Sequence, residues 1–181
     1  MMNDMTTPGL NGGGLPPTAA LTRYTPAARA YITAARERME EVRYGFRVGD
    51  VGLLIGAGVV CEVIAPPPVS SIPHTPSWLS GVTNLRGSLV PVFNLKLLFE
   101  MEPGDRRDEM VLIMDKGEHA VGIVIDGYPH ALQGLRPLAE LPPLPEILRG
   151  HTRLGYLLSG LVWLEFEHRS FFHSLAQKVT S

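Results

Sequence analysis

The sequence contains few of the residues that would indicate disulfide bonds, a strongly charged surface or a membrane-spanning segment. Cys61 is the single cysteine among 181 residues, which excludes an internal disulfide and is typical of a reducing compartment. A net charge of −2 argues against a nucleic-acid-binding surface. No apolar run approaches the length of a membrane span, because glycine, proline or a charged residue interrupts each one. No basic segment followed by an apolar one opens the chain, so the sequence predicts a cytoplasmic protein.

Motifs for catalysis and for cofactor binding are also missing. Among the six histidines, His168 and His173 are five residues apart, which places them on different faces of a helix and not in a metal-binding pair. Gly56 and Gly58 begin like a dinucleotide fingerprint, but the third glycine is absent, so they indicate a bulge or a turn. No hydrolase nucleophile pattern occurs. These absences favour a protein that is not an enzyme and that holds no metal and no cofactor.

The first 41 residues differ in composition from the rest of the chain. Residues 1–22 are rich in glycine, proline and small polar side chains, and they predict a disordered tail. Residues 23–41 predict a helix, because Thr25 is a candidate N-cap, Pro26 stands at the first helical position and alanines recur at helical spacing. This helix either packs on the domain that follows, over residues 42–181, or binds a partner.

From Val42 onward, apolar residues alternate with polar ones, which is the spacing of β-strands. Strands are expected over 42–48, 51–55, 58–65, 81–85, 88–93, 110–115 and 120–126, and in a hairpin that turns at Ser159 and Gly160. The last segment, 167–179, carries apolar residues at helical spacing and predicts a terminal helix. Short strands separated by glycine and proline turns are typical of a mostly-β protein made of barrels or sandwiches.

One stretch, "GVTNLRGSLVPVFNL", places an arginine inside a run that otherwise reads as buried strand. Arg86 precedes Gly87, which permits a positive φ and therefore a turn, and Gly81 permits a tight bend or the close approach of another segment. Pro91 lacks an N–H, so the second strand is expected at an edge or a bulge. An arginine at a short turn suits a partner contact, but a structural arginine that caps carbonyl groups explains the residues equally well.

The same region resembles a family signature. "WLSGVTNLRGSLVPVFNLKLLF", residues 78–99, resembles the motif of CheW-like domains, in which Gly-Val-x-Asn-Leu-Arg-Gly leads into Pro-Val-x-Asp-Leu. "AVGIVIDGYPHAL" is similar to a later strand of that family, with Gly122, Val124 and Asp126 in the matching places. The helix before the domain, the "LPPLPEIL" connection and the closing "WLEFEHRSFFHSLA" look most like the pilus-associated, PilI-type adaptors of twitching motility. Asn94 departs from the motif, since the family usually has aspartate there, but a hydrogen-bonding role remains open to it.

The resemblance implies a fold and a function. The fold would be mostly β, with two packed five-stranded SH3-like β-barrels, an N-terminal helix and a C-terminal helix. We place the first lobe at about 51–99 with a returning segment and the second at about 110–166. The function would be non-catalytic coupling of a CheA-type histidine kinase to the cytoplasmic tip of a methyl-accepting chemoreceptor. Two alternatives stay open: a small-molecule-binding or enzymatic barrel with a ligand between the lobes, and an adaptor that competes within kinase arrays.

The resemblance also selects four residues for partner contact, because the receptor groove of the family lies near the Asn-Leu-Arg-Gly turn. Arg86 would be the anchor, and Asn84 would orient the turn through its side-chain amide. Gly81 and Gly87 would shape the backbone and make no contact themselves.

Overall fold

The computed structural model describes residues 42–102 and 106–180. The tail predicted for residues 1–22 and the helix predicted for residues 23–41 lie outside the described residues. Within the described ranges, no helix combines the length and the apolar character needed to cross a membrane.

Short strands dominate the described part of the chain, as the sequence predicts. The strands are β1 (Arg43–Val48), β2 (Val51–Leu54), β3 (Cys61–Ile64), β4 (Leu79–Leu85), β5 (Ser88–Phe93), β6 (Glu109–Met114), β7 (Val121–Asp126), β8 (His130–Leu132), β9 (Arg136–Pro137), β10 (Gly155–Leu158) and β11 (Leu161–Glu165). The helices are α3 (Leu95–Leu98), α4 (Glu146–Arg149) and α5 (His168–Thr180), with short 3-10 helices η1 (Arg106–Asp108) and η2 (Gly117–His119). The predicted terminal helix and the hairpin that turns at Ser159 and Gly160 are both present.

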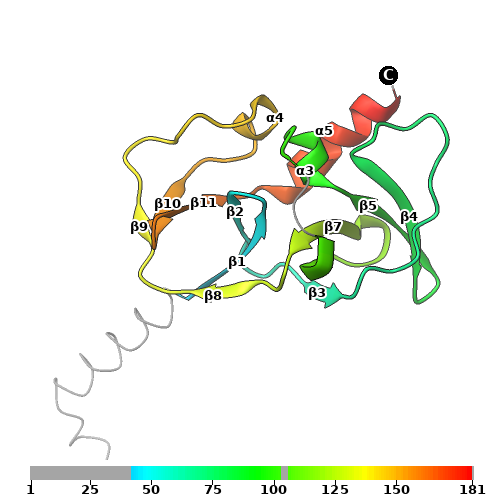
Figure 1. The fold of residues 1–181 in the computed structure, drawn as a ribbon, viewed down its shortest axis with the longest axis horizontal. Coiled ribbons are helices and arrows are strands. Elements are labelled where there is room, and N and C mark those ends of the chain that lie inside the picture. The colour runs from blue at the N-terminus through cyan, green and yellow to red at the C-terminus, as the bar shows by residue number, and fades with distance from the viewer. Residues whose placement is uncertain (1–41, 103–105, 181) are drawn as a thin grey trace, which may run out of the picture. The chain divides into compact units, whose positions relative to one another are not determined.

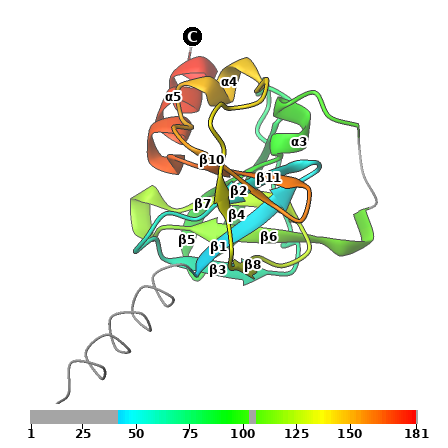
Figure 2. The same ribbon diagram turned by 90° about the vertical axis from the view of Figure 1, so that its left-hand side faces the viewer.

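The strands form two sheets, each of which is the framework of one lobe (Figure 1). Lobe A has six strands in the order β8-β1-β2-β11-β10-β9, and lobe B has five in the order β3-β6-β7-β5-β4. The helices α3, α4 and α5 lie on the same side of the two sheets in both views (Figures 1 and 2). The mostly-β, two-lobed architecture is therefore confirmed, with one strand more in lobe A than the expected five.

The predicted lobe boundaries, 51–99 and 110–166, are wrong. Lobe B is one continuous stretch from β3 to β7, whereas lobe A joins the first two strands to the last four. The reason is that β2 pairs in parallel with β11, with Gly52 opposite Trp163. A parallel pair needs a long crossover connection, and here the whole of lobe B is inserted in that connection.

The edge position expected for Pro91 is wrong, although a β-bulge, the other expectation, does interrupt the same ladder of β4 with β5 between Leu79 and Gly81. Pro91 lies in β5, and β5 is not an edge strand, because β4 and β7 pair with it on opposite sides. The ladder between β5 and β7 includes Val92 and Phe93 and so begins just after the proline. Pro91 is tolerated inside the sheet because that ladder requires no N–H from it.

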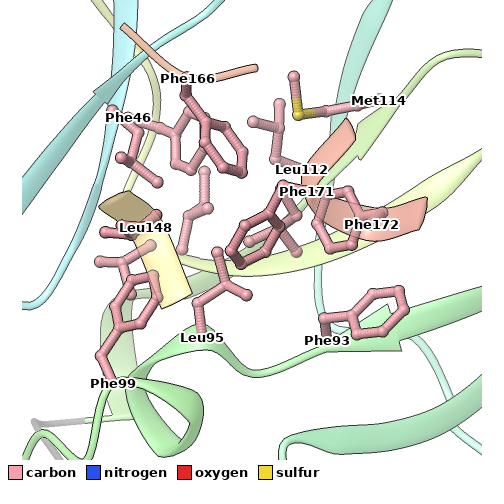
Figure 3. Packing of buried hydrophobic residues seen from close by; sticks show 14 of the residues in the cluster. Phe46, Phe93, Leu95, Phe99, Leu112, Met114, Leu148, Phe166, Phe171 and Phe172 are labelled. Atoms are coloured by element: carbon pink, nitrogen blue, oxygen red, sulfur yellow. The ribbon is translucent and has the colours of Figure 1, made fainter. Parts of the chain in front are cut away.

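The main hydrophobic core lies between the two lobes. Phe46 and Val48 lie on the same face of β1 and meet Leu112 and Met114 of β6 in one continuous cluster. The helix α5 completes this cluster, and Figure 3 shows the rings of its Phe171 and Phe172 together with those of Phe46, Phe93 and Phe166. Smaller clusters around Val90 and Ile113 in lobe B and around Trp163 in lobe A fill the two lobes themselves. The shared core fixes the two lobes to each other.

Candidate partner-binding site

The turn between β4 and β5 presents three of the four residues that the sequence predicts for partner contact. Arg86 and Gly87 form a two-residue loop with φ of 51° and 87°, and Leu85 pairs with Ser88 to close it. Positive φ at both loop residues defines a type I′ turn, whose twist matches that of the flanking strands. The Asn84 side-chain oxygen accepts a hydrogen bond from the Gly87 N–H at 2.8 Å. The side chain of Asn84 therefore stabilises the turn through this hydrogen bond, which is the orienting role that the sequence suggested for it.

Gly81 lies nearer the start of β4 and is buried, so it shapes the site without reaching its surface. Its φ is 135°, and a Cβ at this position would lie 2.1 Å from the Ser70 carbonyl oxygen. Ser70 and Val82 exchange two backbone hydrogen bonds of 2.8 and 2.9 Å. Only glycine allows this close approach, which covers part of the free edge of β4 with the preceding loop.

Arg86 makes a bidentate ion pair that the sequence did not predict. Its Nη2 and Nη1 atoms donate to Glu62 Oε1 and Oε2 at 2.6 and 2.9 Å. The Arg86 side chain is 75% exposed and that of Glu62 is 37% exposed. Glu62 lies on β3 and Arg86 follows β4, and these two strands are the opposite edges of the lobe B sheet. The ion pair therefore links the two edges and helps to close the sheet on itself.

A pocket of about 280 Å³ lies beneath the Arg86–Glu62 pair. Its apolar lining comes from Val60, Leu85, Val90, Ile113 and Ala120. Val90, Ile113 and Ala120 are buried and form the floor, while Val60 is 47% exposed and lies at the rim. Lys116 also lines the pocket, is exposed, and has no ion pair among the described residues. The mouth of lobe B thus combines an apolar floor with two cations at its entrance.

Asp115 lines the same pocket, but its carboxylate is already paired with two side chains of α5. Its two oxygens accept hydrogen bonds from the Arg169 guanidinium at 2.9 and 2.8 Å, and Oδ2 lies 2.8 Å from His168 Nε2. The bonds from Arg169 contribute most to lowering the pKa of Asp115 to about 2, with burial opposing and His168 assisting. Asp115 is therefore ionised at neutral pH, and it fastens the start of α5 to lobe B.

Cys61 stands next to Glu62 but does not supply a reactive group. Burial, with a further contribution from the Asp115 charge, raises the pKa of the Cys61 thiol to about 11. The thiol is therefore protonated near neutral pH, whereas a nucleophile or a metal ligand requires the thiolate. Among the described residues, no group of three or more histidine, cysteine, aspartate or glutamate side chains could hold a metal ion.

A second ion-pair cluster lies inside the molecule, around Lys96 of α3. Lys96 Nζ contacts Asp126 Oδ1 at 2.5 Å and Glu109 Oε1 at 3.4 Å, and the lysine side chain is 5% exposed. Glu109 and Asp126 are directly opposite each other on β6 and β7, so the lysine separates two like charges. Burial alone would lower the pKa of Lys96, but the hydrogen bond and the charge of Asp126, with Glu109, raise it above its ordinary value. Asp126 also accepts the N–H of Gly49 from lobe A at 2.6 Å.

Asn94, where the family motif has aspartate, is the N-cap of α3. Its side-chain oxygen accepts from the N–H groups of Lys96 and Leu97 at 3.1 and 3.4 Å. The amide therefore performs the capping that a carboxylate would perform, without its charge. This cap positions the first turn of the helix that carries Lys96.

A larger cleft of about 780 Å³ lies away from Arg86, between α3, α4 and α5. Glu100, Glu146 and Lys178 stand at its surface, and Phe99 and Ile147 supply apolar area. This cleft has the volume of a small-molecule site, which is about 300–1,000 Å³, whereas the pocket under Arg86 is slightly below that range.

Two kinds of sequence similarity agree on the family. Residues 44–159 match the family model described as the CheW-like domain. The chain is 35% identical to chemotaxis protein CheW of Klebsiella aerogenes over 66% of this chain and 76% of that protein. It is 30% identical to protein PilI of Pseudomonas aeruginosa over 74% of each, and 33% identical to protein FrzA of Myxococcus xanthus over 69% of this chain and 76% of that protein.

A solved structure matches the fold. The scaffolding protein TtCheW from Thermoanaerobacter tengcongensis has a TM-score of 0.59 with this chain at 19% identity, covering 73% of this chain and 92% of the other. At this identity the match establishes the fold alone. The family resemblance predicted from residues 78–99 is confirmed by the match to the family model.

Proposed function

This chain belongs to the CheW-like domain family, and from that membership we propose that it is a non-catalytic coupling protein of a chemosensory system. It would hold a CheA-type histidine kinase to the cytoplasmic tip of a methyl-accepting chemoreceptor. The observation that carries the proposal is the family match over residues 44–159, which includes the whole of lobe B and its turn. The similar structure is itself named a scaffolding protein.

The described residues support a binding role. The buried side chains of Lys96 and Asp115 serve in ion pairs that fasten helices to lobe B, while Arg86 stands in water on a turn with a fixed backbone. A coupling protein needs a few rigidly held polar anchors and apolar surface around them, and it needs no reactive centre. We therefore propose no catalytic activity for the chain and a cytoplasmic location, where both partners present their signalling parts.

The partner-contact residues of the proposal are the four that the sequence selected. Arg86 is the anchor, because its donors remain accessible although Glu62 accepts two of them. Asn84 and Gly87 hold the turn, and Gly81 admits the loop that braces β4. Asn84, Gly87 and Gly81 are therefore required for the shape of the site, and they need not contact the partner themselves.

We propose that this chain belongs to the pilus-associated branch of the family. The support for this branch is the similarity to protein PilI of Pseudomonas aeruginosa, which is 30% identical over 74% of this chain. We therefore expect the chain to serve twitching motility driven by type IV pili. Deletion of the gene in the source cell should reduce surface twitching and leave swimming intact, and the opposite result would assign it to the flagellar branch.

Reconstitution tests the coupling role directly. Receptor cytoplasmic domains on vesicles, the purified kinase and this chain are combined, and the vesicle-bound kinase is measured by sedimentation. We expect the kinase to sediment with the receptor in the presence of this chain and to remain in solution in its absence. Kinase that sediments equally without the chain would contradict the proposal.

A small-molecule function is favoured by one observation, the cleft between α3, α4 and α5, whose 780 Å³ are sufficient for a metabolite. A thermal-shift screen with nucleotides and metabolites distinguishes the two functions. The coupling proposal predicts no compound that raises the melting temperature by several degrees, whereas a ligand-binding function predicts at least one.

A further inference from the structure

The connection between β9 and α4 carries three prolines, Pro142, Pro143 and Pro145, to which the coupling function assigns no task. We propose that residues 141–145, which we call the proline ridge, are a docking ligand for a partner protein with an aromatic groove and a basic side chain at each end of that groove. This inference adds a contact surface to the proposed function and does not depend on it.

Proline chemistry fixes the backbone of the ridge. The ring of each proline locks its own φ near −65°. A residue that precedes a proline is confined to extended backbone, and this applies to Leu141, Pro142 and Leu144. Pro145 has φ −48° and ψ 135°, and no residue of the ridge belongs to a helix or a strand. The ridge is therefore a short polyproline II segment, about 15 Å long.

Two leucines fasten the ridge to the body of the protein and leave its prolines outside. Leu144 packs against the main core, and Leu141 lies over Gly155 of β10, where an added Cβ would be 2.8 Å from Leu141 Cδ2. These leucines are three residues apart, which is one turn of polyproline II. Pro143 is exposed and Pro142 is partly exposed. A partner therefore meets prolines that are already held in one conformation, which limits the entropy lost on docking.

The backbone of the ridge also offers acceptors to a partner. The Leu144 carbonyl accepts from Arg149 Nε at 3.4 Å, and the Pro145 carbonyl accepts the Leu148 N–H at 2.9 Å. Among the described residues, no hydrogen bond reaches the carbonyl groups of residues 141–143. Polyproline II segments dock in aromatic-lined grooves, and unpaired carbonyl groups can accept hydrogen bonds there.

Glu140 and Glu146 account for the basic side chains of the partner. They flank the ridge, one at each end, and both are exposed. Neither carboxylate has an ion pair within the part of the chain that the structure describes. A negative charge at each end of the ridge favours a groove with a cation at each end.

The other proline run, residues 66–68, serves the fold of lobe B. The Pro68 carbonyl accepts a hydrogen bond from the Thr83 hydroxyl at 2.9 Å, and Ser70, two residues further on, pairs with β4. The neighbours of this run, Ala65 and Val69, carry no charge. The run therefore lacks both features that we assign to the ridge and supplies a matched control.

The ridge is distant from the turn at Arg86. In Figure 1 the connection between β9 and α4 runs along the side of the molecule opposite to β4 and β5. A protein on the ridge can therefore be bound at the same time as a partner at Arg86.

Site-directed photo-crosslinking identifies the partner. A photo-reactive phenylalanine derivative replaces Ala139, which is exposed beside the ridge, in the full chain in its source cell. The captured protein is purified and the crosslinked peptide is mapped by mass spectrometry. We expect one dominant protein, captured at a groove lined by aromatic side chains. Capture of a second copy of this chain, capture at a surface without aromatic side chains, or no capture would each overturn the inference.

The affinity of the purified partner for the full chain then tests the residues of the ridge. Pro143→Ala removes the exposed ring, and we expect the dissociation constant to rise about tenfold while the melting temperature stays close to that of the wild type. Glu140→Lys should weaken binding at low ionic strength, and its difference from the wild type should shrink as salt is added.

Pro66→Ala and Glu118→Lys are the matched controls, because they remove an exposed proline and reverse an exposed charge in lobe B. We expect both controls to bind like the wild type. Wild-type affinity in Pro143→Ala would overturn the ridge, and wild-type affinity at low salt in Glu140→Lys would overturn the basic ends of the groove. Losses as large in the controls would also overturn the inference. If Pro143→Ala melts well below the wild type, Glu140→Lys alone decides.

Discussion

Two ion-pair sites in lobe B join segments that are distant in the chain, and they differ in their access to water. Lys96 is 5% exposed and lies between Asp126 and Glu109, whereas Arg86 is 75% exposed and contacts Glu62. The buried pair cannot change partners without leaving a charge in the interior. The exposed pair can, because water compensates for a lost partner. The comparison assigns stability to the buried site, and we propose recognition for the exposed one.

Both cations come from one short stretch of sequence, the family motif of residues 78–99. Arg86 lies at the turn before β5, and Lys96 lies in the helix that follows β5. A single motif therefore contains one residue that holds the fold and one that remains available, and only their burial tells them apart. This division predicts that substitutions at the buried cation and at the braced edge of β4 cost more stability than a substitution at Arg86.

Lys96→Met should have the largest effect. It removes the cation between Glu109 and Asp126, which face each other across β6 and β7, and we expect a loss of about 3 kcal/mol in the free energy of unfolding. Urea denaturation measures the loss. The double variant Lys96→Met/Glu109→Gln should recover part of it, because one of the two opposed charges is gone. If Lys96→Met were as stable as the wild type, the buried ion pairs of Lys96 would not be the source of stability that we assign to them.

Gly81→Ala should have the next largest effect. The added Cβ would lie 2.1 Å from the Ser70 carbonyl oxygen, at a φ of 135° that alanine rarely adopts. We expect a loss of about 2 kcal/mol, measured by thermal denaturation, together with increased protease sensitivity near Ser70. Gly117→Ala is the control, since its φ is also positive but no atom lies within 4 Å of its added Cβ. Equal losses in the two variants would show that strain at φ, and not the approach of Ser70, sets the effect.

Acid should release α5 through Asp115. The pKa of this carboxyl is about 2 in the folded protein, below the value of about 3.9 for an unfolded aspartate, so its ionised form stabilises the fold. That contribution is complete above about pH 4 and disappears as the pH falls towards 2. Asp115→Asn should be less stable than the wild type at pH 7, and the difference should shrink over this window. A difference independent of pH would exclude the ion pair with Arg169 as its source.

Arg86→Glu should have the smallest effect on stability and a large effect on binding. The substituted side chain stays in water opposite Glu62, so we expect the free energy of unfolding to change by about 0.5 kcal/mol. Receptor capture should be lost, since the variant replaces the cation proposed as the anchor of the partner contact with a carboxylate. Thermal denaturation and a receptor pull-down of the same preparation measure the two effects. A large loss of stability would return Arg86 to a structural role.

The sequence predicted local structure well and long-range pairing poorly. The alternation in β1, the turn at Arg86 and Gly87, and the terminal helix each depend on neighbouring residues, and all are present. The parallel pairing of β2 with β11 has no local signal, so the lobe boundaries were wrong.

The candidate site shows the same limit. Arg86, Asn84, Gly81 and Gly87 were selected from one motif, but Glu62 is 24 residues from Arg86 and lies outside that motif. The motif also gave no sign that a pocket lies beneath the turn, because its floor combines strands from different parts of lobe B. Folding brings these residues together through the closure of the sheet, which neither spacing nor composition encodes.

Exchange of the two charges tests the central claim, that Arg86 is present for a partner, most directly. The double variant Arg86→Glu/Glu62→Arg retains an ion pair between β3 and the turn but moves the cation to the other strand. Receptor affinity is measured for the wild type, both single variants and the double variant. We predict that the double variant matches the wild type in melting temperature and still fails to bind the receptor, because the guanidinium no longer extends from the turn. Receptor binding restored to the wild-type level by the exchange would contradict the claim and show that closure of the sheet is all that Arg86 provides.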